Sequence, residues 1–416
     1  MPEKTDIASA IDTAIASASD GDCVLLPAGE YFMSSTVTTD KKVSLLGRGK
    51  GNGGTWLHRP ESMSEAKLDG ETMFVFNINS RDPSNMVFAG FRLSSKTPQG
   101  SGGGAGSLAT DFGIKLRGAV DFVITDCRFE NFGYAGVQIK HFDDLSRGLI
   151  YESEFFHNSK GNGQGLGYGV ALYGEDKTWL DDPQFGSENF IFVEDSNFTR
   201  HRHAMAAGGA ARYVIRHSEV IDSLYNAAGL DAHEGRNVGL GGSNHFATRA
   251  VEAYNNVLRN DHFNDGTPIA PGGNLNDLGL VAIGIRGGEA LIHNNKISGF
   301  LNGISLIVFD DQDDTWSDYS YPYPYQIGWQ SGEALGENHS GTGAGESKGD
   351  VFEWSNDFTP YAPTGQERKY WLDSSNQMPD GMKEGRDYHL DTKRPGYSAF
   401  AYPHPKRINW QGVPSN

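Results

Sequence analysis

Residues 190–201 read FIFVEDSNFTRH, and this stretch decides the fold class. Apolar and polar side chains alternate around the acidic pair, as they do in a β-strand that buries one face. Phe198 follows the polar turn and is the apolar anchor of the phrase. A helical unit would show a period of 3.6 residues instead, so we expect strands here.

The same phrase recurs along the chain as a short polar stretch, an apolar anchor and a polar turn. The other copies are AGFRLSS (89–95), TDCRFENF (125–132), ESEFFHNS (152–159), RHSEVIDS (216–223), YNNVLRND (254–261) and HNNKISGF (293–300). We assign the anchors as Leu93, Phe129, Phe155, Phe198, Val220, Val257 and Ile297. The shortest spacing, from Phe198 to Val220, is 22 residues, and longer spacings add insertions.

A period near 22 residues with strands at each anchor is typical of a stacked solenoid. Each coil buries its apolar side against its neighbours, and the insertions fall in loops. The sequence therefore predicts an all-β solenoid, with a β-sandwich as the structural alternative.

The N-terminal part makes a family resemblance specific. Ile7, Ile11 and Ile15 mark one face of a short helix after a candidate N-cap, Asp6, and GDCVLLPAGEYF follows at 21–32. With the coils, this resembles the single-stranded right-handed parallel β-helix of the pectate-lyase-like superfamily, over residues 5 to 310. The resemblance implies a capping helix and an activity on polysaccharides.

The composition changes at about Asp310, after which the sequence is aromatic, acidic and rich in Pro and Gly. We predict a β-helix with its cap over residues 1–310, and a C-terminal extension over 311–416 that packs on the outside of the coils. The aromatic tail KRPGYSAFAYPHPKRINW is unlike a disordered linker. A separate small domain is the alternative.

Composition narrows the classes of function. The net charge of −18 argues against nucleic-acid binding, and no apolar run approaches the length of a membrane span. Cys23 and Cys127 are the two cysteines, too few for a disulfide framework, and we expect both to be buried thiols. The N-terminus has no signal-peptide pattern, so a secreted or periplasmic location, expected from the function below, assumes that a signal was removed. The pattern does not specify an oligomeric state.

The strand after each anchor's turn predicts two opposite faces. We expect an inward set that consists of Ile114, Leu116, Ile139, Val170, Leu172, Ala204, Ala206, Leu230, Ala232, Ile283 and Ile285. The outward set is then Lys115, Arg117, Gln138, Lys140, Ala171, Tyr173, His203, Met205, Asp231, His233 and Arg286. Cations, histidines and a tyrosine thus share one face of an acidic protein, which favours an anionic polysaccharide as the partner.

Polysaccharide lyases of this superfamily use such residue types. Removal of the proton beside a uronate carboxyl group needs neutralisation of that carboxylate, a base, and a donor to the leaving oxygen. We predict catalytic roles for His233, Tyr173, Arg286 and His203. We predict substrate binding by Lys140, Asp231, Arg202, Lys115, Arg117 and Trp179.

The stretch DAHE at 231–234 supports His233 as the base, with Asp231 beside it to orient the imidazole or bind a sugar hydroxyl. It resembles the Asp-Pro-His-Glu motif of mannuronan C5-epimerases, with Ala232 in place of proline, so alginate is favoured over pectate. The structural alternative is a His–Asp hydrogen bond within a turn. For Arg202 and His203 the alternative is a solvated, salt-bridged turn.

Two acidic groups suit other chemistry. Asp181 with Asp182, or the run Asp310, Asp311, Asp313 and Asp314, would be the carboxylates of a glycoside hydrolase. That run would also suit Ca²⁺, although no cofactor is required and a solvated loop explains it equally. Trp179, His262 and Phe263 lie in insertions where they could stack on sugar rings.

We therefore expect a polysaccharide lyase, a carbon–oxygen lyase that cleaves a uronate polymer by β-elimination. The alternatives are a C5-epimerase or glycoside hydrolase on the same scaffold, and a carbohydrate-binding or adhesion β-helix without catalysis.

Overall fold

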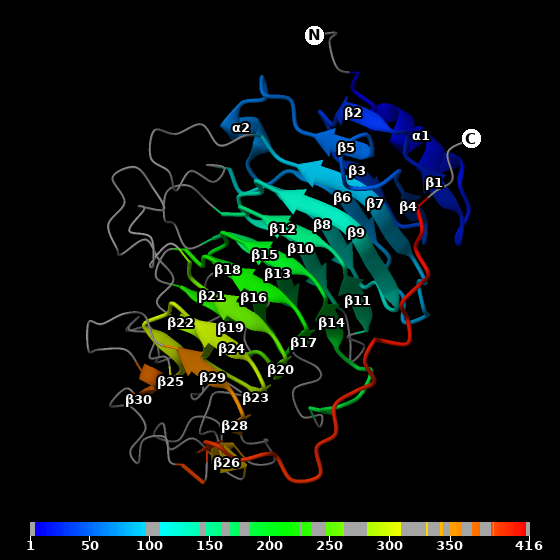
Figure 1. The fold of residues 1–416 in the computed structure, drawn as a ribbon. Coiled ribbons are helices and arrows are strands. Elements are labelled where there is room, and N and C mark those ends of the chain that lie inside the picture. Colours follow the sequence, from blue (N-terminus) through cyan, green and yellow to red (C-terminus); the bar gives the residue numbers. More distant parts are fainter. Residues whose placement is uncertain are drawn as a thin grey trace.

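The computed structural model is a parallel β-helix with three faces, and every strand pairing in it is parallel (Figure 1). It describes residues 5–96, 109–141, 147–159, 166–174, 183–224, 227–233, 247–261, 281–308, 330–331, 342–343, 350–359, 368–374, 384–385 and 387–412. The solenoid expected from the repeated phrase is confirmed, and the β-sandwich alternative is wrong.

We number the faces in the order in which the chain meets them. Face 1 holds β1 (Cys23–Leu25), β4 (Ser44–Leu46), β11 (Gly148–Tyr151), β14 (Ile191–Glu194), β17 (Arg212–Arg216), β20 (Ala250–Tyr254), β23 (Glu289–His293), β28 (Val351–Trp354) and β31 (Tyr388–His389). Face 2 holds β2 (Gly29–Phe32), β5 (Thr55–His58), β12 (Glu154–Phe156), β15 (Asn197–Thr199), β18 (Glu219–Ile221), β21 (Val257–Arg259), β24 (Lys296–Ser298) and β29 (Asp357–Thr359). The longer strands β7 (Val87–Ser94) and β9 (Phe122–Glu130) run from face 1 onto face 2.

Face 3 is a separate ten-stranded sheet that will carry the candidate site. Its strands in order are β3 (Val37–Thr39), β6 (Thr72–Asn77), β8 (Phe112–Arg117), β10 (Ala135–Lys140), β13 (Tyr168–Tyr173), β16 (His203–Gly208), β19 (Ala228–Ala232), β22 (Val281–Ile285), β25 (Asn302–Val308) and β30 (Arg368–Ser374). A short pair, β26 (Gln330–Ser331) and β27 (Thr342–Gly343), lies outside these faces.

The anchors of the repeated phrase stack inside the coils. The rings of Phe129 and Phe155 lie 5.1 Å apart between centroids, and those of Phe155 and Phe198 lie 4.6 Å apart and nearly parallel. One assigned anchor is wrong: Leu258, not Val257, pairs with Val220 and lies in the core. Val257 pairs with Glu219 and Lys296, so it occupies the position one residue before the anchor in its coil.

The polar residues of the phrase form a ladder of hydrogen bonds in the turn between faces 1 and 2. Each coil places one residue in the left-handed region there, as Asp195 and Asn255 do with φ of 48° and 58°. The following side chain bonds to the neighbouring coil: Asn295 Oδ1 accepts from the backbone N of Asn256 (3.1 Å), and Asn356 Oδ1 accepts from that of Asn295 (2.9 Å). Asp and Asn tolerate the left-handed region, so the turn chemistry fixes the coil register.

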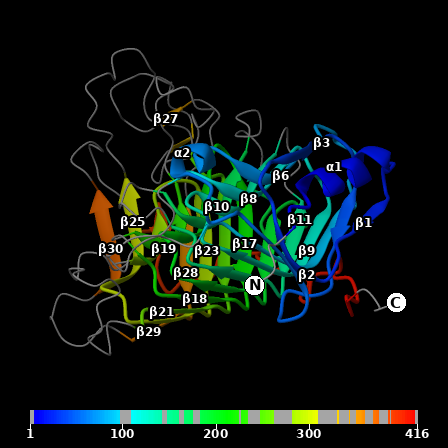
Figure 2. The same cartoon turned by 90° about the horizontal axis from the view of Figure 1, so that it is seen from above.

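The N-terminal end of the coils is covered by α1 (Ala8–Ser17), which lies beside β1 and β3 (Figure 2). Ala8, Ile11 and Ile15 are buried, as their spacing predicts. The N-cap is Ile7, and Asp6 Oδ1 accepts a hydrogen bond from Ala8 N at 3.0 Å instead. A second helix, α2 (Glu65–Leu68), lies between β5 and β6 in the chain. Among the described residues, no helix is both long and apolar enough to cross a membrane.

The coils do not stop at residue 310, because β28, β29 and β30 add a further coil to the three faces. Phe358, in the phrase SNDFT, pairs with the anchor Ile297 and packs on the core. Beyond β31 the chain turns back along face 1 as far as Trp410, whose Nε1 donates to Asp126 at 3.2 Å (Figure 1). We call residues 390–412 the tail.

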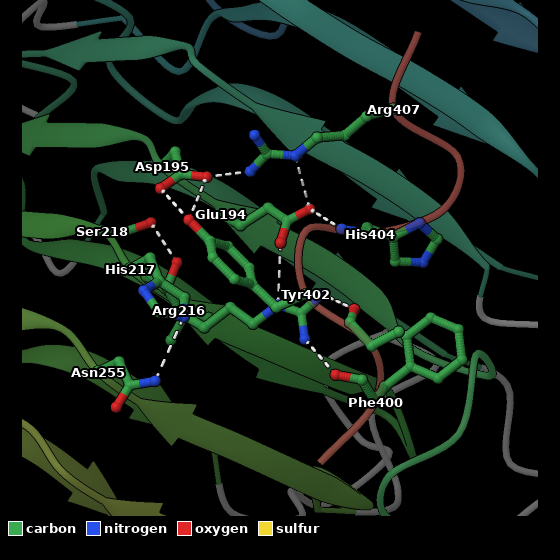
Figure 3. A network of polar contacts seen from close by, with 12 residues as sticks. Glu194, Asp195, Arg216, His217, Ser218, Asn255, Phe400, Tyr402, His404 and Arg407 are labelled. Carbon is green, nitrogen blue, oxygen red and sulfur yellow. Dashed lines mark hydrogen bonds and ion pairs between the residues drawn. The ribbon is translucent and has the colours of Figure 1, made fainter.

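The tail is held by ion pairs on face 1. Arg216 donates to Glu194 Oε2 at 2.9 Å and to the tail carbonyl groups of Phe400 and Ala401, both at 2.7 Å. Arg407 of the tail donates to Glu194 Oε1 at 3.1 Å, so this fully buried carboxylate lies between two guanidinium groups (Figure 3). Face 1 is therefore covered by the chain itself along much of its length.

The asparagine ladder makes a stability prediction. Asn295→Ala removes the acceptor of Asn256 N and the donor of Ala253 O, both buried, and should lower the free energy of unfolding by about 3 kcal/mol. Asn197→Ala, at an exposed position of β15, should change it by less than about 0.5 kcal/mol. Denaturant unfolding measures both, and equal losses would contradict a stabilising role for the ladder.

Candidate functional site

The parallel register of face 3 arranges its outward side chains in columns. Column I contains Phe112, Ala135, Tyr168 and His203, and column II contains Lys115, Gln138, Ala171, Ala206 and Asp231. Column III contains Arg117, Lys140, Tyr173 and Gly208, and continues through His233 and Arg286 directly after β19 and β22. Residues of one column lie about 4.8 Å apart from coil to coil.

Two orientations in β16 differ from the expectation. Met205 points into the core, where it pairs with Val170 and Leu230, and Ala206 lies on the outside in column II. The cause is a corner at the start of each strand, where two consecutive residues, here Ala204 and Met205, both belong to the core. Strict alternation fails at a corner, and the other predicted inward residues are all in the core.

The small residues at this corner are required by close packing. At the equivalent position of β13, a Cβ added to Gly169 would lie 2.5 Å from Cδ1 of Phe198 and 2.7 Å from the carbonyl oxygen of Ala204. At this position of β13 the ring of Phe198 therefore leaves room only for a glycine. This packing determines which of the following residues in the strand point outward.

Tyr173, His233 and Arg286 share column III, as predicted. The backbone N of His233 donates to Ala207 O at 2.9 Å, and that of Arg286 donates to Ala232 O at 2.9 Å, so the ladder continues past the strand ends. Gly208 lies between Tyr173 and His233, two coils apart. All three side chains are partly exposed.

Asp231 and Arg286 form a bidentate ion pair. Arg286 Nε donates to Oδ1 at 3.0 Å and Nη2 donates to Oδ2 at 2.6 Å, and Asp231 is 1% exposed. Burial alone would raise the pKa of Asp231, but the attraction and hydrogen bonds of Arg286 hold it well below its usual range. Asp231 is thus a permanent carboxylate, and Arg286 is a cation whose charge is already compensated.

His203 is a buried neutral base beside this pair. Its Nδ1 lies 2.5 Å from the carbonyl oxygen of Ala228, which only accepts, so the ring proton lies on Nδ1. Its Nε2 is buried without a hydrogen-bond partner, 3.9 Å from Oδ2 of Asp231. Burial and the nearby charge of Arg202 lower the pKa of His203 to about 3, although Asp231 opposes this. The Nε2 lone pair is therefore available at neutral pH.

A cluster of phenols adjoins His203. The hydroxyl groups of Tyr134 and Tyr173 lie 2.6 Å apart, and the ring of Tyr168 stacks on that of His203 with a centroid distance of 5.6 Å. Arg202 Nη1 donates to the Tyr168 hydroxyl at 3.2 Å. Burial raises the pKa of Tyr168 to about 12 and that of Tyr173 well above its ordinary value, so both are neutral phenols.

The remaining predicted cations lie on earlier coils of the same face. Lys115, Arg117 and Lys140 belong to β8 and β10, with Gln138 next to Lys115 in register. Lys140 is next to Tyr173 in register, whereas Lys115 and Arg117 lie one coil further from the His203 cluster. The structure therefore places the predicted residues on one continuous face from β8 to β22.

The sequence pattern did not predict that Tyr134 and Tyr168 belong to this cluster. Tyr168 lies at the start of β13, before the corner. It is two residues from the buried Val170, so strict alternation wrongly predicts that Tyr168 points into the core. Tyr134 precedes β10 and joins the outer cluster through Phe112, 4.4 Å away between centroids. Aromatic residues just before the small corner residue would have been the available signal.

Several candidates lie outside the described residues. These are Trp179, Asp181, Asp182, His262, Phe263 and the run Asp310, Asp311, Asp313 and Asp314. In the part of the chain that the structure describes, no group of three or more His, Cys, Asp or Glu residues could hold a metal ion. Of the two cysteines, Cys127 is buried as expected, whereas Cys23 is exposed.

Comparison with known proteins shows likeness at the level of the fold. No protein-family model and no curated protein matches the sequence. DFA-IIIase from Arthrobacter chlorophenolicus shares 13% identity with a TM-score of 0.47, over 94% of this chain and 96% of that one. The Dettilon tailspike protein shares 15% with a TM-score of 0.45, over 93% of this chain, which spans 65% of the tailspike chain. An alginate lyase from Paenibacillus shares 11% with a TM-score of 0.34, over 88% of this chain and 95% of that one.

The lowered pKa of His203 makes stability depend on pH. Between the unfolded pKa near 6.5 and the folded value of about 3, the unfolded chain binds more protons, so acidification destabilises the fold. From pH 7 to pH 5 this residue should account for about 2 kcal/mol of the loss in the free energy of unfolding.

The variant His203→Gln should therefore lose about 2 kcal/mol less than the wild type over that pH interval, by denaturant unfolding at both pH values. Asn197→Ala serves as the control and should keep the wild-type pH dependence. An unchanged pH dependence in His203→Gln would show that the imidazole is protonated in the folded protein.

Proposed function

We propose that the protein is a polysaccharide lyase that cleaves a uronic-acid polymer by β-elimination, with alginate as the first substrate to test. The observation that carries this proposal is the outward composition of β13–β22 on face 3. Neutral phenols, a neutral imidazole with an available lone pair and arginine side chains lie there on successive coils. These are the residue types that β-elimination requires.

The chemistry divides into steps that conserve atoms and electrons. A base removes the proton beside the uronate carboxyl group, and the electron pair of that C–H bond forms a double bond to the neighbouring carbon. The bond from that carbon to the glycosidic oxygen breaks, and the oxygen takes up a proton. We assign the base to His233 and the proton donor to Tyr173, whose hydroxyl interacts with Tyr134.

The ion pair on Asp231 changes the role of Arg286. Because Arg286 already binds Asp231, its charge is less available to the substrate carboxylate. Arg202 is the better candidate, since it makes no salt bridge to a described carboxylate and binds the neutral Tyr168 hydroxyl. Arg286 then holds Asp231 in place beside His203, and the buried ring of His203 supports the stacked ring of Tyr168.

The described outward residues of β8–β22 support elimination over hydrolysis. Among them Asp231 is the one carboxylate, and it is buried in its ion pair. A glycoside hydrolase of the usual kind needs two carboxyl groups on either side of the bond that it cleaves. A C5-epimerase would share the proton abstraction but return a proton to the same carbon without breaking the chain.

The test is an assay with alginate, polymannuronate and pectate, followed by the ultraviolet absorbance of the unsaturated uronate end. The wild type should produce this absorbance, and His233→Ala and Arg202→Ala should each lower kcat/KM by at least about 100-fold. Lys296→Ala, an exposed cation of face 2, should keep the wild-type rate.

Other products would identify other functions. New reducing ends without the absorbance would indicate a hydrolase. Exchange of the uronate proton with solvent, without chain cleavage, would indicate an epimerase. Retention on the polymer without any product would indicate a binding protein, and each of these results contradicts the lyase.

A further inference from the structure

A second group of cations lies on face 3, on the coils that precede those of Tyr173 and His203, with Lys140 next to Tyr173 in register. Lys115 of β8 and Gln138 of β10 lie in column II. Arg117 and Lys140 of the same two strands lie in column III. Arg117 is exposed, and the other three are partly exposed. Four hydrogen-bond donors thus form a patch on neighbouring coils; we call these residues the distal patch.

Two cations of the distal patch, Lys115 and Arg117, are poorly compensated by the described part of the protein. Neither Lys115 nor Arg117 forms a salt bridge with a described carboxylate, and Lys115 Nζ lies 3.4 Å from the centroid of the Phe112 ring. Burial and the neighbouring charge of Arg117 lower the pKa of Lys115 to about 8, with Glu71 acting in the opposite sense. In a protein of net charge −18, two cations that repel each other are a site for an external anion.

The position of the patch relative to the proposed catalytic residues has a definite length. Arg117 lies in column III on β8, and Gly208, between the proposed donor Tyr173 and the proposed base His233, lies in the same column on β16. Three steps of the coil spacing give about 14 Å. A sugar unit of a 1,4-linked chain is about as long as one coil spacing, so Arg117 lies about three sugar units from the bond that is cleaved.

We infer that Lys115 and Arg117 of the distal patch bind a carboxylate of the same polymer, about three units from the bond that is cleaved. The polymer then runs across the strands of face 3, along the stacking direction of the coils. This inference rests on the proposed function for the identity of the polymer. Its consequence is that longer chains are better substrates than short ones.

The experiment compares a mannuronate trimer with an octamer. A trimer that spans the cleaved bond extends at most two units to either side and cannot reach Lys115 and Arg117, whereas the octamer can contact both sites. In the wild type, kcat/KM should be at least about tenfold higher for the octamer than for the trimer. In the double variant Lys115→Gln with Arg117→Gln, that ratio should fall about tenfold, because two charge-assisted contacts are lost.

The matched control removes two cations elsewhere. Lys296→Gln with Lys393→Gln changes the net charge equally, at exposed positions of face 2 and the tail, and should keep the wild-type ratio. An unchanged ratio in the Lys115 and Arg117 variant would overturn the distal patch while leaving the lyase intact.

A second measurement does not depend on turnover. Retardation of the protein in a native gel that contains polymannuronate should decrease in the Lys115 and Arg117 variant and stay at the wild-type level in the control. Equal retardation of the two variants would overturn the inference. Absence of product from every polymer, with retardation that depends on the patch, would overturn the lyase and retain the patch.

Discussion

The parallel hydrogen-bond register between neighbouring coils is the constraint on which the rest of the structure depends. It places residues that are 21 to 66 positions apart in sequence about one strand spacing apart in space. Asp231 and Arg286 illustrate this, since 55 residues separate them in the chain and two hydrogen bonds join them on face 3. A slip of the register by one residue would turn each outward column into the core.

Three features hold that register in the molecule. The anchor rings stack inside, the asparagine and serine side chains bond from turn to turn, and the tail binds face 1 over many coils. The tail matters for function as well, because it covers face 1 and leaves face 3 to carry the partly exposed cations and phenols. One chain thus separates a face used for packing from a face suited to a ligand.

Much of this could be predicted from the sequence, because the repeated phrase contains both the anchor and the turn. The fold class, the capping helix and the shared face of Tyr173, His233 and Arg286 all follow from it. It was harder to predict positions at which a shift of one residue changes an inward side chain into an outward one. Met205 was exchanged with Ala206 because a corner puts two consecutive residues into the core. Val257 was chosen as an anchor although the next residue, Leu258, pairs with Val220.

Pairing between side chains could not be predicted from the sequence. Nothing in DAHE shows that Asp231 is bound by Arg286, or that Tyr134, from a turn, meets the hydroxyl of Tyr173. The last coil was missed because its anchor, Phe358, lies far beyond the preceding phrase. These contacts depend on the lengths of the insertions, which the periodic pattern does not determine.

The central claim is that face 3 between β13 and β22 binds the reacting sugar. A crystal structure of His233→Ala soaked with a mannuronate trisaccharide tests it most directly. The account predicts the sugar over Gly208, between Tyr173 and the position of His233, with its carboxylate on Arg202. A trisaccharide bound to face 2 or at an end of the coils, with face 3 empty, would contradict it.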